Sequence, residues 1–201
     1  MNAPFDITGI RLESDRLILR EWEKEDANDL FNYASVPGVG EMAGWPHHKN
    51  IEESRYRVNK FIEEKHVFAI VLKDNNKVIG SVGVETYGLE DNLSEFFNYQ
   101  GREIGYALSK DCWGQGIMPE AVNLVINYLF NVLDYDFLLC GHFDFNEQSK
   151  RVQEKCGFKP YRKLFFDTSM DNKEPGVLSL LINPKKNIEF KFSHPETLLI
   201  K

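Results

Sequence analysis

The stretch EIGYALSKDCWGQGIMPEAVNLVINYLF, residues 103–130, decides the fold because it joins a strand, a glycine turn and an apolar helical pattern in succession. Gly114 and Gly116 stand one residue apart in the turn, and Pro119 falls in the first helical turn, where its missing N–H would have no intrahelical partner. Glycines at a helix N-terminus leave backbone N–H groups open to a phosphate. A bare G-x-G is equally typical of a tight turn, so the surrounding sequence must separate the two readings.

Outward from this stretch, a period of two residues predicts strands and a period near 3.6 predicts helices. Strands are expected over residues 12–20, 66–73, 77–87, 101–109, 135–143, 161–168 and 176–182, and helices over 23–35, 50–65, 117–132 and 146–156. Runs of strands with interspersed helices indicate an α/β (α+β) protein, with a mixed, mostly antiparallel central sheet and helices on both faces. The strict alternation of a doubly wound nucleotide fold is missing, and so is a P-loop ending.

Composition narrows the class of protein. The chain has 201 residues and a net charge of −7, which suit one soluble domain and argue against a general nucleic-acid binder. No apolar run is long enough to span a membrane, and the first residues lack the pattern of a secretory signal, so we expect a cytoplasmic protein. Cys112, Cys140 and Cys156 are widely spaced, which favours small core-filling thiols over a metal or disulfide site.

The opening stretch strongly resembles the acyl-CoA-binding motif of the GCN5-related N-acetyltransferases, the GNAT superfamily, and particularly its RimJ/RimL-like branch of ribosomal-protein N-acetyltransferases. That branch reads E-I-G-Y, then W-G-x-G-x-x-x-E-A, then y-x-F, and the matches are Glu103–Tyr106, Trp113–Gly116, Glu120–Ala121 and Tyr128–Phe130. Three further stretches agree in the family's own order: ESDRLILREWEKEDANDLF, MAGWPHHKNIEES and NEQSKRVQEKCGF.

The resemblance covers residues 10–183 as one GNAT domain and leaves 184–201 as a C-terminal extension, in which IEFKF alternates like an edge strand. It implies acetyl-CoA as co-substrate, no metal, direct acetyl transfer to a primary amine, and a homodimer by family habit. The acceptor is either a protein N-terminal α-amine or a small amine, and the acidic net charge mildly favours a cationic one. Two alternatives stay open: a non-catalytic acyl-CoA-binding or sensing module of the same fold, and a purely structural α/β domain.

The resemblance also implies a cofactor site between the strands at 103–108 and 137–142. Pyrophosphate would rest on the glycine-turn amides, and pantetheine would pair with strand backbone and with the Asn of the Asn-x-x-Ser motif. The implied cofactor-binding residues are Tyr106, Ala107, Leu108, Trp113, Gly114, Gln115, Gly116, Ile117, Met118 and Asn146. Asp111 departs from the family, which has Arg or Gln there, so we expect its side chain to point away from the phosphates.

Two residues are predicted to carry the chemistry. Glu103 is the candidate base, because an amine is nucleophilic only when neutral and this branch often carries Glu there. Strand alternation places Glu103 and Gly105 on the same face of the strand, and the direction of that face decides whether the Glu103 carboxylate points into the cleft. The alternative is that Glu103 is an ordinary strand residue that faces solvent. Ser149 is the candidate acid for the leaving thiolate, since Gln153 stands where many superfamily members have Tyr. The alternative is that Asn146 is simply a helix N-cap with Ser149 in its first turn.

Histidines and aromatic residues complete the list of candidates. His47 and His48 follow Trp45-Pro46 and suit either the acceptor pocket or a solvated loop, while nothing near His142 completes a Ser/His/Asp set. The aromatic residues before the cleft strand suit a substrate wall, a dimer contact or plain packing; they are Phe96, Phe97 and Tyr99.

Overall fold

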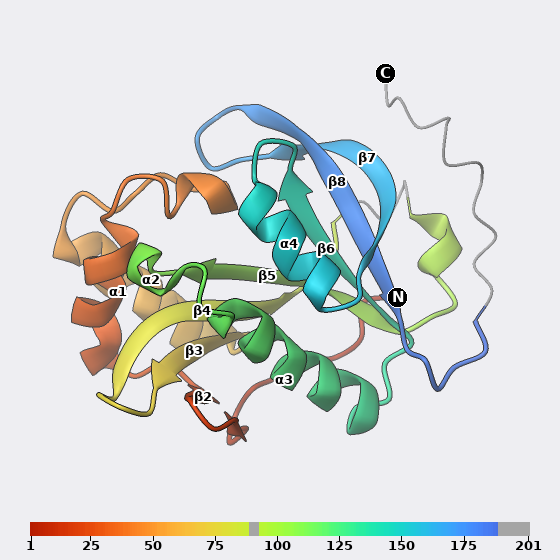
Figure 1. Cartoon of the computed structure of the whole chain (residues 1–201), viewed down its shortest axis with the longest axis horizontal. Coiled ribbons are helices and arrows are strands. Elements are labelled where there is room, and N and C mark those ends of the chain that lie inside the picture. The colour runs from red at the N-terminus through yellow and green to blue at the C-terminus, as the bar shows by residue number, and fades with distance from the viewer. Residues whose placement is uncertain (89–92, 189–201) are drawn as a thin grey trace.

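One eight-stranded sheet runs through the computed structural model, which describes residues 1–88 and 93–188 (Figure 1). Its strands are β1 (Leu12–Glu13), β2 (Leu17–Arg20), β3 (Val67–Leu72), β4 (Lys77–Glu85), β5 (Gly101–Leu108), β6 (Phe137–Phe143), β7 (Lys159–Asp167) and β8 (Lys173–Ile182). They lie in the order β1-β2-β3-β4-β5-β6-β8-β7, and every neighbouring pair is antiparallel except β5 and β6. The expected mixed, mostly antiparallel sheet is therefore confirmed.

Four helices cover the two faces of the sheet in the described ranges: α1 (Ala27–Ala34), α2 (Ile51–Glu64), α3 (Ile117–Asn131) and α4 (Glu147–Lys155). Alternation along β3 separates the faces, since Phe68 and Ile70 pack in one hydrophobic cluster with α3, whereas Ala69 and Val71 pack in another with α1 and α2. A third cluster lies over the β6–β8 end of the sheet, where Phe96 stacks on Phe137 with ring centroids 4.4 Å apart. Phe96 is thus a core residue.

Local signals in the sequence account for several element ends. Asn50 caps α2 by accepting a hydrogen bond from the backbone N–H of Glu53 at 3.1 Å, as Asn does at this position. Gly157 ends α4 at φ 88°, a left-handed conformation that glycine adopts without strain. Residues 74–76 join β3 and β4 in an antiparallel hairpin, with Asn76 at φ 56°.

Two expectations need revision or fall outside the described chain. The single strand predicted over 12–20 is instead a tight hairpin, because β1 folds back antiparallel on β2 and the Ser14 hydroxyl accepts the backbone N–H of Leu17 at 3.0 Å. All of IEFKF after Ile188, and with it the edge strand considered there and most of the 184–201 extension, lies outside the described residues. No helix within residues 1–88 and 93–188 is long and apolar enough to cross a membrane. The three cysteines are buried and unpaired.

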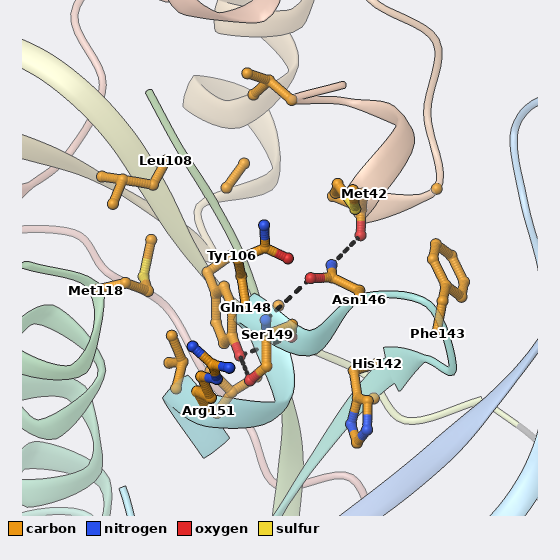
Figure 2. A pocket seen from close by; sticks show the side chains of 18 of the residues that line it. Met42, Tyr106, Leu108, Met118, His142, Phe143, Asn146, Gln148, Ser149 and Arg151 are labelled. Atoms are coloured by element: carbon orange, nitrogen blue, oxygen red, sulfur yellow. Dashed lines mark hydrogen bonds between the residues drawn. The ribbon is translucent and has the colours of Figure 1, made fainter. Parts of the chain in front are cut away.

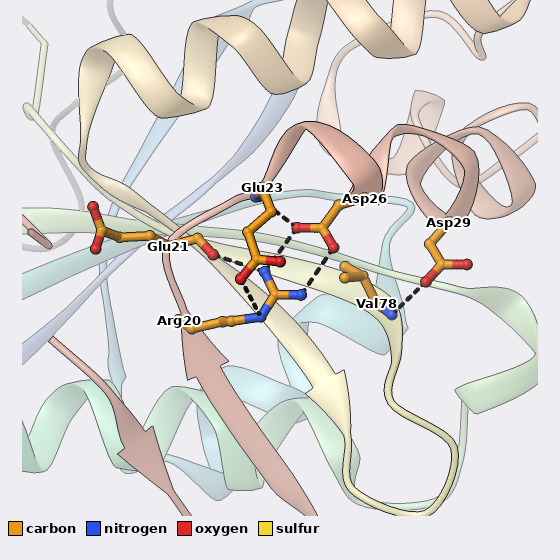
Figure 3. Close-up of polar contacts among 6 residues, drawn as sticks. All are labelled: Arg20, Glu21, Glu23, Asp26, Asp29 and Val78. Carbon is orange, nitrogen blue, oxygen red and sulfur yellow. Dashed lines mark hydrogen bonds and ion pairs between the residues drawn. The ribbon is translucent and has the colours of Figure 1, made fainter. Parts of the chain in front are cut away.

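A buried ion pair joins the sheet to the first helix (Figure 3). Arg20, the last residue of β2, donates from both terminal nitrogens to the two carboxylate oxygens of Asp26 at 2.7 and 2.8 Å. Asp26 also accepts the backbone N–H of Glu23 at 2.8 Å, so it fixes the turn that leads into α1. One turn later, Asp29 accepts the backbone N–H of Val78 from β4 at 2.9 Å. These contacts orient α1 on the sheet, and with it the loop that follows.

We expect Asp26→Ala to lower the free energy of unfolding by about 3 kcal/mol, because it leaves a largely buried guanidinium without its partner. Urea unfolding measures the loss. Glu25→Ala, an exposed carboxylate in the same turn, is the matched control and should change stability by less than about 0.5 kcal/mol. Equal losses for the two variants would show that the pair does not stabilise the fold.

Candidate active site

The candidate site is a cleft that opens where β5 and β6 separate. These two strands form a parallel ladder at only three positions, Gly101–Glu103 against Phe137–Leu139, and then diverge. The resulting cleft has a volume of about 810 Å³ and is lined by β5, β6, the start of α3, the first turns of α4, the end of β7 and the loop between α1 and α2. Beyond Glu103, β5 stays paired with β4 alone, so its other edge faces the cleft.

The glycine turn lies at one end of this cleft. Gly114 and Gly116 adopt φ values of 75° and 73°, and Gly116 is the N-cap of α3 without any side-chain cap bond. A Cβ on Gly114 would meet nothing within 4 Å, so this glycine is required for its backbone angle and not for lack of space. The first amides of α3 are left without a side-chain acceptor at the positive end of the helix dipole, which is a suitable place for an anion.

An ion pair that sequence reasoning missed braces the turn. Arg16, just before β2, donates its Nε to the Glu120 carboxylate at 2.9 Å and its Nη1 to the Gln115 carbonyl at 3.2 Å. Ser14 donates a further hydrogen bond to Glu120 at 2.5 Å. Glu120 belongs to the motif already quoted, but its partners lie about a hundred residues away, so no local pattern identifies them.

Most of the predicted cofactor-binding residues line the cleft, and they are Tyr106, Ala107, Leu108, Trp113, Gly114, Gly116, Ile117, Met118 and Asn146. Gln115 does not line it, because its side chain turns back to donate to the Asp111 carbonyl at 2.7 Å. Asp111 itself is exposed and away from the cleft lining, in agreement with the expectation for this departure from the family motif.

Glu103 does reach the cleft. Ile104 is 1 % exposed in the cluster under α3, so alternation turns Glu103 to the opposite face, where its Oε1 lies 3.5 Å from the point a Cβ on Gly141 would occupy. Burial, and secondly the negative charge of Glu85, raise the pKa of Glu103 from 4.5 to about 7. A carboxyl group with such a pKa accepts and releases protons near neutrality, as a general base must.

Ser149 and Tyr106 meet on the other wall of the cleft (Figure 2). The Tyr106 hydroxyl lies 2.9 Å from the Ser149 hydroxyl and donates to the Ser149 carbonyl at 3.1 Å. Burial raises the pKa of the Tyr106 phenol, which therefore stays protonated. The two hydroxyls form a protonated pair inside the cleft, so Tyr106 joins Ser149, the acid predicted from the sequence.

Asn146 has the structural role considered from the sequence. Its Oδ1 accepts the backbone N–H of Ser149 at 3.0 Å, which caps α4, and its Nδ2 donates to the Met42 carbonyl at 2.9 Å (Figure 2). Gln153, where many superfamily members carry Tyr, is 2 % exposed and bridges α4 to β6. It donates to the Gly141 carbonyl at 2.9 Å and lies 2.9 Å from Nδ1 of His142.

The loop between α1 and α2 closes one side of the cleft. Three contacts hold it: Lys110 donates to the Pro37 carbonyl, Asn146 to Met42, and the backbone N–H of Ser169 to Gly44 at 2.8 Å. Trp45 lines the cleft.

The histidines that follow Trp45 do not line the cleft. His47 bonds to Glu41 at 2.7 Å and His48 to Ser54 at 2.7 Å, so both have structural partners in or beside the loop. Within residues 1–88 and 93–188, no cluster of His, Cys, Asp and Glu is arranged to hold a metal ion.

Comparison with known proteins agrees with this geometry. The model of the acetyltransferase (GNAT) domain family matches residues 16–159, more than half of the chain. The chain belongs to the GNAT family. A relative named "Uncharacterized N-acetyltransferase YoaA", from Bacillus subtilis (strain 168), is 28% identical over 153 residues, which are 74% of this chain and 82% of YoaA.

Solved GNAT structures share the fold. An acetyltransferase of the family from Bacillus anthracis aligns with a TM-score of 0.74 at 19% identity, covering 87% of this chain and 99% of that one. Ribosomal-protein-S5-alanine acetyltransferase from Vibrio fischeri aligns at 0.67 and 23% identity over 88% and 98% of the two chains. The self-immunity acetyltransferase MccE, solved with acetyl-CoA and AMP, aligns at 0.68 and 18% identity over 84% and 93%.

We expect Glu103→Gln to stabilise the protein at neutral pH. Because the folded protein holds this proton up to about pH 7 and the unfolded chain releases it near 4.5, wild-type stability falls as pH rises between those values. Gln cannot ionise, so the variant's advantage in free energy of unfolding should grow across that window to roughly 2 kcal/mol, a figure reduced for solvent screening of a half-buried group. Urea unfolding at several pH values measures it, and an advantage independent of pH would contradict the assignment.

Proposed function

We propose that this GNAT protein uses acetyl-CoA to acetylate a primary amine by direct transfer. The main support is the position of Glu103, a carboxylate that titrates near neutrality and shares one cleft with the glycine turn. The turn offers amides for phosphates, the free edge of β5 offers backbone for an amide-bearing chain, and Glu103 offers a base in the same cleft.

In the proposed complex, the pyrophosphate rests on the amides of residues 113–117 and pantetheine runs along the free edge of β5 at 106–108. Leu108 and Met118 supply apolar wall on the same side of the cleft (Figure 2). Contact between Asn146 and pantetheine stays a prediction, since its amide nitrogen is bonded to Met42 in the structure. Placement of thioester and amine within one enclosed cleft supplies much of the rate.

The chemistry requires two proton movements. The acceptor nitrogen attacks the thioester carbonyl carbon, a C–N bond forms, the C–S bond breaks, and the proton lost by nitrogen passes to Glu103 directly or through water. The leaving sulfur takes a proton from the Ser149 hydroxyl, which Tyr106 positions through their 2.9 Å contact. Solvent then returns a proton to Ser149 and removes the one held by Glu103, so both groups are restored. A backbone N–H on the free edge of β5 stabilises the developing oxyanion.

The acceptor is proposed to be a protein N-terminal α-amine, as the resemblance to the RimJ/RimL-like branch suggests, or a small cationic amine. Both are supported by the same features: a carboxylate on the acceptor side of the cleft and a net charge of −7, which attracts cations. The loop between α1 and α2, which hydrogen bonds hold in place, closes the acceptor side of the cleft and so limits which acceptors can enter.

A thiol-release assay tests this function. The protein is mixed with acetyl-CoA and, separately, with peptides carrying Ala or Ser N-termini, polyamines, amino acids and aminoglycosides, and free CoA is measured together with the acetylated product. We expect release with at least one acceptor class. Tight acetyl-CoA binding without release for any acceptor would overturn the catalytic proposal and leave a binding module.

With an active acceptor in hand, we expect Glu103→Gln to lower kcat/KM by roughly 10²-fold or more, because the variant has no group to take the amine proton. The dissociation constant for acetyl-CoA, measured by calorimetry, should change little. The matched control is Glu63→Gln on the exposed face of α2, which should retain wild-type kinetics. Wild-type kcat/KM in Glu103→Gln would exclude Glu103 as the base.

A further inference from the structure

Glu85, the last residue of β4, lies directly opposite Glu103 in the β4–β5 ladder. Opposed residues of an antiparallel pair project from the same face with their Cβ atoms about 5 Å apart, and like charges in such pairs are destabilising. A second carboxylate beside the candidate base therefore costs stability. Folding stability therefore does not explain why a glutamate lies opposite Glu103.

Two glycines make room for the Glu85 side chain. A Cβ on Gly83 would stand 2.2 Å from the Glu85 Oε1, and a Cβ on Gly105 would stand 3.8 Å from its Cγ. The side chain thus lies back across β4 and β5 toward Gly105, which lines the cleft. The Glu85 side chain is partly exposed and lies beside the cleft lining, over the two glycines.

His66 contacts the second carboxylate oxygen of Glu85. Its Nε2 lies 2.8 Å from the Glu85 Oε2, and its Nδ1 lies 3.1 Å from the Glu64 carbonyl. Both neighbours are acceptors, and only the imidazolium has a proton on each nitrogen, so the two contacts are satisfied together when His66 is charged. The bond to Glu85 raises the pKa of His66 against the opposing effect of burial.

The other titratable groups around Glu103 are either buried thiols or have partners of their own. On β6, Cys140 points to the other face and burial keeps its thiol neutral, while His142 is bonded to Gln153. Asp167 of β7 also lines the cleft and is paired with Lys173 at 3.0 Å. Glu64 reaches His66 only at 3.9 Å. Glu85 is consequently the charged group that acts most directly on Glu103.

We propose that Glu85 and His66 are positioning residues that set the strength of the base: the Glu85 charge makes Glu103 more basic, and His66 moderates that charge. The proposal rests on the proposed function, in which Glu103 takes the proton of the acceptor amine. It adds two residues outside the family motif to the catalytic arrangement. Their substitutions have opposite signs, because one removes a negative charge near Glu103 and the other removes the positive charge that compensates it.

The test is a titration of Glu103 by NMR in protein carrying carboxyl-¹³C glutamate, without any acceptor or acetyl-CoA. The resonance that titrates near neutrality and disappears in Glu103→Gln belongs to Glu103. We expect Glu85→Gln to lower its midpoint by roughly one pH unit, and His66→Gln to raise it by a smaller amount. Glu63→Gln, which removes the same charge from an exposed site on α2, should leave the midpoint unchanged.

A Glu103 midpoint that Glu85→Gln leaves in place, or that both variants move in the same direction, overturns the proposal. In the plot of kcat/KM against pH, the midpoint on the acid side should move in each variant as the NMR midpoint does. Two acceptors with different amine pKa values show which midpoint belongs to the enzyme, because that midpoint is the same for both. Since the NMR titration needs no acceptor, failure of turnover in the wild-type protein overturns the proposed function separately, without obscuring the result for Glu85.

Discussion

The early end of the β5–β6 ladder is the constraint on which the rest of the site depends. After three residue pairs the strands part, and one edge of β5 keeps backbone donors and acceptors without a strand partner. Buried backbone groups need partners, so such an edge is stable only beside water or a ligand with its own amide groups. On the β6 side, the Gln153 side chain donates a hydrogen bond to the Gly141 carbonyl. This bond fixes α4 against β6 where it has parted from β5.

Because of this opening, alternation along β5 sends different chemistry to the two sides of the cleft. Ile104 and Leu108 belong to the hydrophobic cluster under α3, where the glycine turn presents its amides. Glu103 and Gly105 face the opposite way, toward Glu85 and the loop between α1 and α2. One strand thereby separates the side that holds the glycine-turn amides from the side that holds the two glutamates.

The acidic side is held together by contacts between distant parts of the chain. Arg20 and Asp26 orient α1, and the loop after α1 is tied to the β5–α3 turn through Lys110 and to α4 through Asn146. The Asn146 side chain therefore caps α4 and also holds the loop that closes one side of the cleft.

The sequence by itself determined the element order, the mixed sheet, the glycine turn, and the helix ends at Asn50 and Gly157, because these depend on periodicity and on residues close together in the chain. The choice of Glu103 as candidate base rested on the resemblance to the family motif and stays a prediction. Only the tertiary structure decided three features: the hairpin turn at residues 14–16 between β1 and β2, the ion pair between Arg16 and Glu120, and the direction of the Gln115 side chain away from the cleft. The tertiary structure also decided that Glu85 lies opposite Glu103 and that His66 contacts Glu85. Strand register and loop closure bring together these side chains, which no local pattern connects.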